Sequence, residues 1–517
     1  MRQTERVVVI GAGIGGLVAA YELAARGLDV TLVERAAAPG GKMREIAVAG
    51  RAIDSGPTVL TMRWVFEELF AAHGENFSDH VKLSPAEILA RHAWSEYERL
   101  DLFADNERSA DAIGDFAGLA EAQRFLEFCE RARATYATLE GPFIKSAGPT
   151  PISLARGAGL KGLGDLWRIS PFTTLWHALG TYFHDQRLRQ LFGRYATYCG
   201  SSPFAAPATL MLVAHVEQSG VWLVEGGMHR LAVALAEAAS AHGARFRYGA
   251  ETREVEAKSG KVSGVTLASG ERIDCDAVIV NGDVAAVAAG CFGESVRPAM
   301  APVRPSARSL SAVTFSLLAE THGFPLTRHN VFFSRDYRRE FDDIFERGIL
   351  PAEPTVYVSA QDRGADLNEQ SSAAAGSERL LCLVNAPPLG DARDFSLEEI
   401  ERCRETALGA LRRSGLIVDT RPEAMVTTTP RDFARLYPAT GGALYGQASH
   451  GWAVSFTRPT ARTKIPGLYL AGGSTHPGPG VPMAALSGRL AAASIVADLT
   501  SASPSRKAAM SGGMSTA

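Results

Sequence analysis

The first apolar run of the chain is short, continuous and followed by glycines. Residues 7–10 read Val-Val-Val-Ile, which predicts a strand buried on both faces, as in a parallel sheet. A glycine-rich turn comes next, and the alanine-rich stretch 17–26 predicts a helix. A second apolar run at 29–33 predicts another strand, which ends at Glu34. This order of strand, glycine turn, helix, strand and acid predicts a βαβ unit.

The glycine turn has the spacing Gly-x-Gly-x-x-Gly, and its glycines have steric reasons. Gly11 permits a tight turn, Gly13 lets the backbone approach a pyrophosphate, and Gly16 lets the helix pack closely on the strand. The phosphates then face the N-terminus of the helix. The Glu34 carboxylate can accept hydrogen bonds from both ribose hydroxyls of an adenosine, and it would repel a 2′-phosphate. We therefore expect a dinucleotide site; a glycine turn that holds no nucleotide is the alternative.

Two later parts of the chain carry patterns of the same kind. The run 231–241 predicts a helix, and the apolar runs that end at Val255 and cover 262–265 and 277–280 predict strands. Residues 467–483 combine a short strand, a loop of small residues and the start of an alanine-rich helix. Glycines in such a loop permit close approach to a cofactor.

Length, charge and cysteine content narrow the function classes. A chain of 517 residues is several times the size of one cooperative core, so we expect two interlocked domains. A net charge of -3 gives no electrostatic reason to bind nucleic acid. The six cysteines are scattered without metal-ligand spacing, which indicates reduced thiols and no metal site. We also expect no signal peptide, no membrane-spanning segment and a cytoplasmic location, since no apolar run is long enough to cross a bilayer.

A second glycine loop follows Glu34 and bears on which dinucleotide is bound. It begins at Arg35 and continues to Pro-Gly-Gly-Lys-Met at 39–43. This continuation resembles that of the phytoene-desaturase and amine-oxidase flavoproteins, in which the glycine pair and the basic residue lie along a non-covalently bound FAD. The resemblance implies FAD rather than NAD.

The most specific match is the segment 54–66, which reads Asp-Ser-Gly-Pro-Thr-Val-Leu-Thr-Met-Arg-Trp-Val-Phe. Together with the glycine loop at 40–43 and Gly-Gly-Ser-Thr-His-Pro-Gly-Pro-Gly-Val-Pro-Met-Ala at 472–484, it resembles the carotenoid desaturase (phytoene desaturase) family. Within that family it is most similar to the bacterial 1-hydroxycarotenoid 3,4-desaturases, also called methoxyneurosporene dehydrogenases. The resemblance covers nearly the whole chain, although 85–215 and 300–450 match mainly in length.

The resemblance implies an α/β fold with a Rossmann-like FAD-binding domain of the phytoene desaturase/amine oxidase type and an interleaved α+β substrate-binding domain. The expected FAD-binding domain comprises 1–84, 221–290 and 455–500, and the expected substrate-binding domain comprises 85–220 and 291–454. The tail 501–517 is rich in Ser, Ala, Gly and Met, and we expect it to be disordered.

The same resemblance implies a set of cofactor contacts, most of them at glycine loops. They are Gly11, Gly13, Ile14, Gly15, Gly16, Glu34, Arg35, Gly41, Lys42, Gly56, Pro57, Thr58, Thr252, Gly472, Gly473, Val481, Pro482 and Met483. The backbone of Thr252 would meet the adenine, although Thr252 can also simply pair within a strand. Ser474 stands where many relatives carry Asp, which puts one acidic contact to the cofactor in doubt. Residues 281–283 are more simply a turn after a buried strand.

The implied reaction is dehydrogenation of the 3,4 bond of an acyclic 1-hydroxy- or 1-methoxycarotenoid, with hydride transfer to flavin N5. The polyene can stabilise cation-like character at the adjacent carbon, so no general base is assigned. His476 can contact the flavin or substrate, or only organise its loop. Arg63 can hold a terminal hydroxyl or a flavin oxygen, or form a structural ion pair. No haem, iron–sulfur or second nicotinamide motif is visible, which favours oxygen or a membrane quinone as the terminal acceptor.

The aromatic content of residues 158–223 suits the wall of an apolar tunnel for a carotenoid, but also an ordinary core. Basic side chains near this stretch can lie at an anionic membrane surface or on a solvated face; they are Lys145, Arg156, Lys161 and Arg168. A substrate that resides in lipid favours a location peripheral to the cytoplasmic membrane.

Three other functions stay open from the sequence. A phytoene desaturase or a redox-neutral carotene isomerase would use the same fold and cofactor. An amine oxidase would release hydrogen peroxide, and a non-catalytic carotenoid-binding protein would retain FAD only for structure. Product chromatography, peroxide release and anaerobic flavin reduction distinguish these functions.

Overall fold

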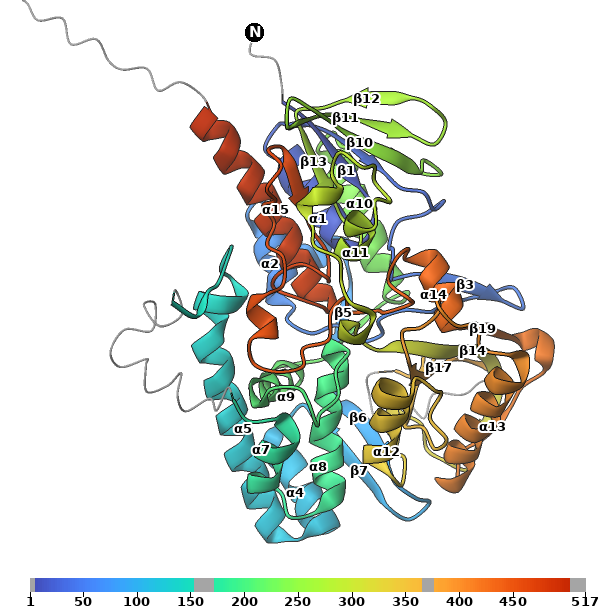
Figure 1. Cartoon of the computed structure of the whole chain (residues 1–517). Helices are drawn as coiled ribbons and strands as arrows, with labels where there is room; N and C mark the ends of the chain where they lie inside the picture. The colour runs from blue at the N-terminus through green and yellow to red at the C-terminus, as the bar shows by residue number, and fades with distance from the viewer. Residues whose placement is uncertain (1–4, 153–171, 365–375, 503–517) are drawn as a thin grey trace, which may run out of the picture.

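The computed structural model describes residues 5–152, 172–364 and 376–502. The expectations for Arg156, Lys161, Arg168 and the tail 503–517 lie outside these residues. Figure 1 shows a parallel sheet and its helices in the upper part of the molecule, and a larger sheet with a helical layer in the lower part.

The upper part is built on a five-stranded parallel sheet, which confirms the α/β fold class. Its strand order is β20-β13-β1-β2-β9. The strands are β1 (Arg6–Ile10), β2 (Asp29–Val33), β9 (Arg245–Arg247), β13 (Ala277–Val280) and β20 (Leu468–Leu470). Residues 7–10 are all buried, as their continuous apolar run predicts. The sheet thus joins the beginning, middle and end of the chain.

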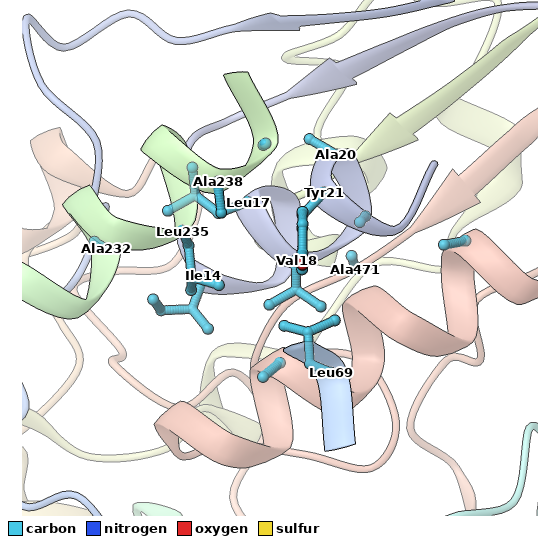
Figure 2. Close-up of a cluster of buried hydrophobic side chains, with 14 of the residues drawn as sticks. Ile14, Leu17, Val18, Ala20, Tyr21, Leu69, Ala232, Leu235, Ala238 and Ala471 are labelled. Atoms are coloured by element: carbon cyan, nitrogen blue, oxygen red, sulfur yellow. The ribbon is translucent and has the colours of Figure 1, made fainter. Parts of the chain in front are cut away.

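Four helices pack beside this sheet around one apolar core. They are α1 (Ile14–Ala24), α2 (Trp64–Ala71), α10 (His229–Ala241) and α15 (Val481–Ala502). Figure 2 shows Leu17 and Val18 of α1 between Leu235 of α10 on one side and Leu69 of α2 on the other. Every residue of α1 is buried, because other elements cover it on several sides.

The length and apolar composition of α15 bear on the expectation that the chain has no membrane-spanning segment. Among the described residues, the helix over Val481–Ser501 is long and apolar enough, by length and composition, to cross a membrane. However, Ala485, Ala491 and Ile495 are buried in the same core as α1. Its apolar character is therefore that of a helix packed inside a folded domain.

The lower part contains an eight-stranded sheet in the order β18-β14-β17-β16-β15-β6-β7, with β19 paired to β14. Its strands are β6 (Ile88–Ala93), β7 (Arg99–Phe103), β14 (Ser311–His322), β15 (His329–Phe332), β16 (Val356–Ala360), β17 (Glu378–Ala386), β18 (Ile417–Asp419) and β19 (Met425–Thr428). Only β15 and β6 run parallel; the other pairs are antiparallel.

The two faces of this sheet have different partners, because side chains alternate along each strand. Val313, Phe315 and Leu317 of β14 pack on one face with Cys403 and Leu411 of α13 (Leu397–Arg413). Figure 1 shows α13 lying against this side of the sheet. The opposite face is free to contribute to a site.

A helical layer completes the lower part. Its members are α4 (Asn106–Ala117), α5 (Leu119–Leu139), α7 (Leu175–Tyr182), α8 (Gln186–Gly193), the 3₁₀ turn η2 (Arg194–Cys199) and α9 (Leu212–Gln218). Phe125, Phe128, Phe183 and Phe192 are buried together in this layer, where Phe183 and Phe192 stack with ring centroids 4.8 Å apart. These aromatic residues therefore form a core.

Further short elements complete the described structure. They are β3 (Glu45–Val48), β4 (Arg51–Asp54), α3 (Phe77–His80), β5 (Leu83–Pro85), β8 (Trp222–Val224), β10 (Thr252–Lys258), β11 (Lys261–Leu267), β12 (Arg272–Asp274), α11 (Val284–Ala288), α12 (Tyr337–Asp342) and α14 (Pro430–Leu436). The domain limits expected from the sequence stay a prediction.

Candidate cofactor and substrate site

One continuous cavity of about 810 Å³ joins the parallel sheet to the larger sheet. At one end it is lined by glycine loops that follow β1, β2 and β20, and at the other end by apolar side chains of the lower part. Apart from Gly16, all the cofactor contacts expected from the sequence line it: Gly11, Gly13, Ile14, Gly15, Glu34, Arg35, Gly41, Lys42, Gly56, Pro57, Thr58, Thr252, Gly472, Gly473, Val481, Pro482 and Met483. The fold brings these distant residues together.

The first glycine turn leaves the N-terminus of α1 open toward this cavity. Gly13 occupies the position before the helix, no side chain caps the helix, and no acidic residue lies in its first turn. The free backbone amides and the helix dipole together suit an anionic group such as a pyrophosphate. Gly11 has φ of 99°, a conformation that favours glycine. The geometry thus fits a dinucleotide.

Gly16 has a packing role and does not line the cavity. A Cβ atom added at Gly16 would lie 2.1 Å from the carbonyl oxygen of Gly11. This close approach agrees with the steric reason expected for the third glycine. Its assignment as a direct cofactor contact stays a prediction.

The carboxylate of Glu34 is held in place by backbone amides. The amide of Ala12 donates to Oε2 at 2.7 Å, and the amide of Ala36 donates to Oε1 at 2.8 Å. Hydrogen bonds from fixed amides hold the carboxylate at the end of β2, where it lines the cavity. Its remaining acceptor capacity is available to a ribose hydroxyl.

The two basic residues of the second glycine loop contact a segment from far along the chain. Lys42 donates to the carbonyl of Leu444, and its ammonium group lies 5.1 Å from the centre of the Tyr437 ring. Burial lowers the pKa of Lys42, and the charge of Asp283 partly opposes this shift. Arg35 donates to the carbonyl of Leu436. Both side chains therefore tie the glycine loop to the 436–444 segment beside the cavity.

The C-terminal loop meets the first glycine turn directly. A Cβ atom at Gly15 would lie 2.9 Å from the amide of Gly472 and 3.0 Å from the carbonyl oxygen of Ala484. Ser474 accepts a hydrogen bond from the amide of Val284 at 3.1 Å. Ser474 thus anchors α11 to this loop.

Thr252 lies at the start of β10, where it pairs with Leu267 and also lines the cavity. Its buried hydroxyl has no hydrogen-bond partner among the described residues. Both readings of Thr252 are thus compatible with its position, and the adenine contact stays a prediction.

Residues 281–283, which the sequence pattern indicates only as a turn, form a further group in the cavity wall. Asn281 donates from its side-chain amide to the carbonyl of Gly11 at 3.1 Å, and Asp283 caps the N-terminus of α11. Asn281, Gly282 and Asp283 all line the cavity. One available signal was their position at the carboxyl end of a buried strand, where open α/β sheets bind ligands.

Neither His476 nor Arg63, the two residues considered for catalysis, lines the cavity. His476 is buried, donates from Nε2 to the Phe143 carbonyl at 3.0 Å and packs edge-on against the Phe143 ring. Burial lowers the pKa of His476. Arg63 forms an ion pair with Glu67 at 2.7 Å and lies over the Trp222 ring. These contacts agree with the structural alternatives, and a role of either residue in turnover stays a prediction.

The other end of the cavity is mainly apolar. The larger sheet supplies its floor: Thr314, Val331, Thr355, Tyr357, Leu381, Leu383 and Asn385. The helical layer and neighbouring loops supply its walls: Leu139, Phe143, Ile144, Arg194, Tyr198, Leu210, Leu212, Val213, Val216, Trp452 and Phe456. The sequence left a tunnel wall and an ordinary core open for the aromatic residues of 158–223. Phe172 and Tyr198 line this cavity, whereas Phe183, Phe192 and Tyr195 belong to the helical core.

Comparison with known proteins identifies the family. Residues 14–496 match the family described as flavin containing amine oxidoreductase. The chain is 56% identical over 515 residues to the hydroxyneurosporene desaturase of Rubrivivax gelatinosus, covering 99% of this chain and 97% of the relative. It is 44% identical over 505 residues to the hydroxyneurosporene desaturase of Cereibacter sphaeroides, covering 97% and 100%.

The solved structure of an oxidoreductase from Methanosarcina mazei has the same fold, with a TM-score of 0.58 at 17% identity over 95% of this chain and 100% of that chain. A likeness at this identity concerns the fold alone. The family match over residues 14–496 and the two relatives show that the chain belongs to the flavin containing amine oxidoreductase family, with FAD as its cofactor, in the branch that includes the hydroxyneurosporene desaturases.

Proposed function

We propose that the protein is an FAD-dependent carotenoid desaturase that dehydrogenates the 3,4 bond of acyclic 1-hydroxy- or 1-methoxycarotenoids. The observation that carries the proposal is one continuous cavity, which has the glycine loops at one end. Its other end, lined by the residues of the larger sheet and the helical layer given above, is called the apolar chamber. The relatives named hydroxyneurosporene desaturase support the substrate class.

The glycine loops and Glu34 are the residues proposed to hold the cofactor. When bound, FAD supplies the hydride acceptor for the dehydrogenation. The chain's own residues supply placement and exclude water. Leu210, Val213 and Val216 offer apolar contacts along one wall of the chamber, which suits a hydrocarbon chain.

Peripheral membrane binding is a further part of the proposal, because the substrate dissolves in lipid. Phe172 and Trp452 line the cavity and are 64% and 42% exposed. Their rings contact each other edge to face, with centroids 5.2 Å apart. Exposed aromatic residues beside an apolar cavity suit a membrane interface. Lys145, by contrast, forms ion pairs with Glu140 and Glu68. These ion pairs favour a position on a solvated face over one at an anionic membrane surface.

Liposome flotation tests this membrane contact. We expect Trp452→Ser to reduce binding to vesicles with anionic lipids, whereas Tyr97→Ser, at a site that is 88% exposed on the hairpin between β6 and β7, leaves it unchanged. Equal flotation of both variants and the parent protein would remove the proposed contact.

The terminal electron acceptor is proposed to be oxygen or a membrane quinone. Reoxidation of the reduced protein, measured by stopped flow with each acceptor under otherwise anaerobic conditions, compares the two. Faster reoxidation by a nicotinamide than by either would contradict this proposal.

The main test uses purified FAD-loaded protein and liposomes that contain 1-hydroxyneurosporene. A red-shifted product lighter by two hydrogens supports the proposed reaction. Phytoene conversion without conversion of the hydroxylated substrate would identify a phytoene desaturase. A chromatographically distinct product of unchanged mass would identify an isomerase, and peroxide release with amines alone would identify an amine oxidase.

A further inference from the structure

Arg194 is a buried cation with unused hydrogen-bond donors in the wall of the apolar chamber. It is 7% exposed, begins the turn η2 and lines the cavity. Its Nη1 donates to the hydroxyl oxygen of Tyr198 at 3.2 Å. Nε and Nη2 have no hydrogen-bond partner among the described residues. A buried donor without an acceptor costs free energy. A ligand oxygen that accepts a hydrogen bond from Arg194 would therefore be stabilising.

The charges around Arg194 define what kind of oxygen fits. Glu217 is 2% exposed, and its Oε2 lies 3.9 Å from Nη2 of Arg194. The carboxylate balances the guanidinium charge within the protein. A second negative charge from a ligand would be buried without a counter-ion, whereas a neutral hydroxyl or ether oxygen would need none. The subsite therefore suits a neutral acceptor.

A second polar group faces the same chamber from the floor. Thr314, Leu383, Tyr357 and Val331 form one row across β14, β17, β16 and β15, because each is the register partner of the next. All four residues line the cavity. Tyr357 therefore places a hydroxyl within an otherwise mostly apolar row.

Tyr357 links this row to the cofactor loop. Its hydroxyl shares a hydrogen bond with Thr58 at 2.6 Å and lies 2.7 Å from Nδ1 of His329. Burial, with the charges of Arg328 and Arg194, lowers the pKa of His329 to about 3, so the imidazole is neutral. The charge of Arg194 also acts on Tyr357. Arg194, Tyr198 and Tyr357 line the same cavity, and Tyr357 contacts Thr58 of the cofactor loop, which also lines it.

This position matches the chemistry of the proposed substrate. The carotenoid end is hydrocarbon except for one oxygen on C1, and C1 is separated from the reacting C3 by a single carbon. An enzyme that binds this oxygen must therefore bind it close to the cofactor and not at the far end of the chamber. We propose that Arg194, with Tyr198 and Tyr357, binds the C1 oxygen and thereby places the 3,4 bond for dehydrogenation. This inference rests on the proposed function.

The subsite also predicts which substrates are accepted. Arg194 can only donate, and both a hydroxyl and a methyl ether offer an acceptor oxygen. The same polyene without the oxygen leaves the donors of Arg194 unsatisfied. Sites built around a substrate hydrogen bond discriminate strongly against analogues that lack it.

The test compares three carotenoids that differ only at C1: the alcohol, its methyl ether and the hydrocarbon. For the FAD-loaded protein in liposomes we expect kcat/KM for the alcohol to exceed that for the hydrocarbon by at least about 10-fold, with the ether closer to the alcohol. In Arg194→Met this preference falls to within about 3-fold, and the new double bond is no longer confined to the 3,4 position. Tyr357→Phe gives a smaller loss of preference.

Arg189→Met is the matched control, since Arg189 lies on the adjacent helix α8, packs over Trp176 and does not line the cavity. It is expected to keep the parent preference. An equal fall of all three rates in Arg194→Met, at unchanged preference, would overturn the subsite. So would a parent protein that treats alcohol and hydrocarbon alike, a measurement that requires no variant.

A binding measurement separates this inference from the proposed function. Quenching of tryptophan fluorescence by each carotenoid gives dissociation constants without turnover. If the parent protein converts none of the three, the proposed function fails. The subsite then stands if the alcohol binds at least about 10-fold tighter than the hydrocarbon in an Arg194-dependent way, and falls if it does not.

Discussion

Replacement of Gly16 by alanine tests the packing that we infer for the first glycine turn. The added Cβ atom would lie 2.1 Å from the Gly11 carbonyl oxygen and 3.0 Å from the side-chain nitrogen of Asn281. Carbon and oxygen atoms do not approach so closely, so α1 must move away from the turn by about 1 Å. Such overpacking typically costs about 1–3 kcal/mol.

The displacement falls on the helix end that would hold the pyrophosphate. Moving the amides at the start of α1 lengthens charge-assisted hydrogen bonds, so we expect FAD binding in Gly16→Ala to weaken by at least about 10-fold. Titration of the apoprotein with FAD measures the dissociation constant, and a thermal melt of the apoprotein measures stability separately.

The matched control is Gly409→Ala in α13, where a Cβ atom meets nothing within 4 Å. This helix-interior replacement is expected to stabilise by about 0.5–1 kcal/mol and to leave FAD affinity unchanged. Parent-like FAD affinity and melting temperature in Gly16→Ala would refute the inferred close packing.

Two further predictions concern the carboxylates of Glu34 and Glu340. Glu34→Ala removes the acceptor of the Ala12 amide and the proposed ribose contact, so we expect FAD affinity to fall by about 10-fold or more in the same titration, and unchanged affinity would exclude that contact. Burial raises the pKa of Glu340 to about 7 despite hydrogen bonds from Thr355. A raised folded-state pKa gives stability that is present below the ordinary value and lost as the pH rises through about 7, so Glu340→Gln should gain about 2–3 kcal/mol relative to the parent between pH 5 and 8. The exposed Glu346→Gln variant is the control, and a pH-independent difference in melting temperature for Glu340→Gln would contradict the assignment.

Local patterns predicted the dinucleotide part of the fold well. The runs 7–10 and 29–33 became β1 and β2, and the run 277–280 became β13 at the same residues. Continuous apolar runs are a strong signal, because a strand covered on both faces needs apolar side chains at every position. The glycine spacing was equally informative, because positive φ and close packing restrict those positions to glycine.

The residues that line the apolar chamber were much harder to predict from the sequence. Its floor residues, such as Thr314, Tyr357 and Leu383, lie on three strands and carry no motif. The aromatic content of 158–223 was compatible with both a tunnel wall and an ordinary core, because composition does not say which way a side chain points. The packing of α15 in the core was also not evident from the sequence, because length and apolar composition alone do not distinguish a buried helix from a membrane span.

The sequence by itself determined the family, the cofactor class and the βαβ unit, because each depends on contiguous residues whose order has a steric meaning. Only the tertiary structure decided that Arg194 from the helical layer, Tyr357 from the larger sheet and Thr58 from the cofactor loop border one cavity. Their proximity follows from strand register and from packing between segments up to hundreds of residues apart. Such long-range contacts leave no local pattern in a single chain.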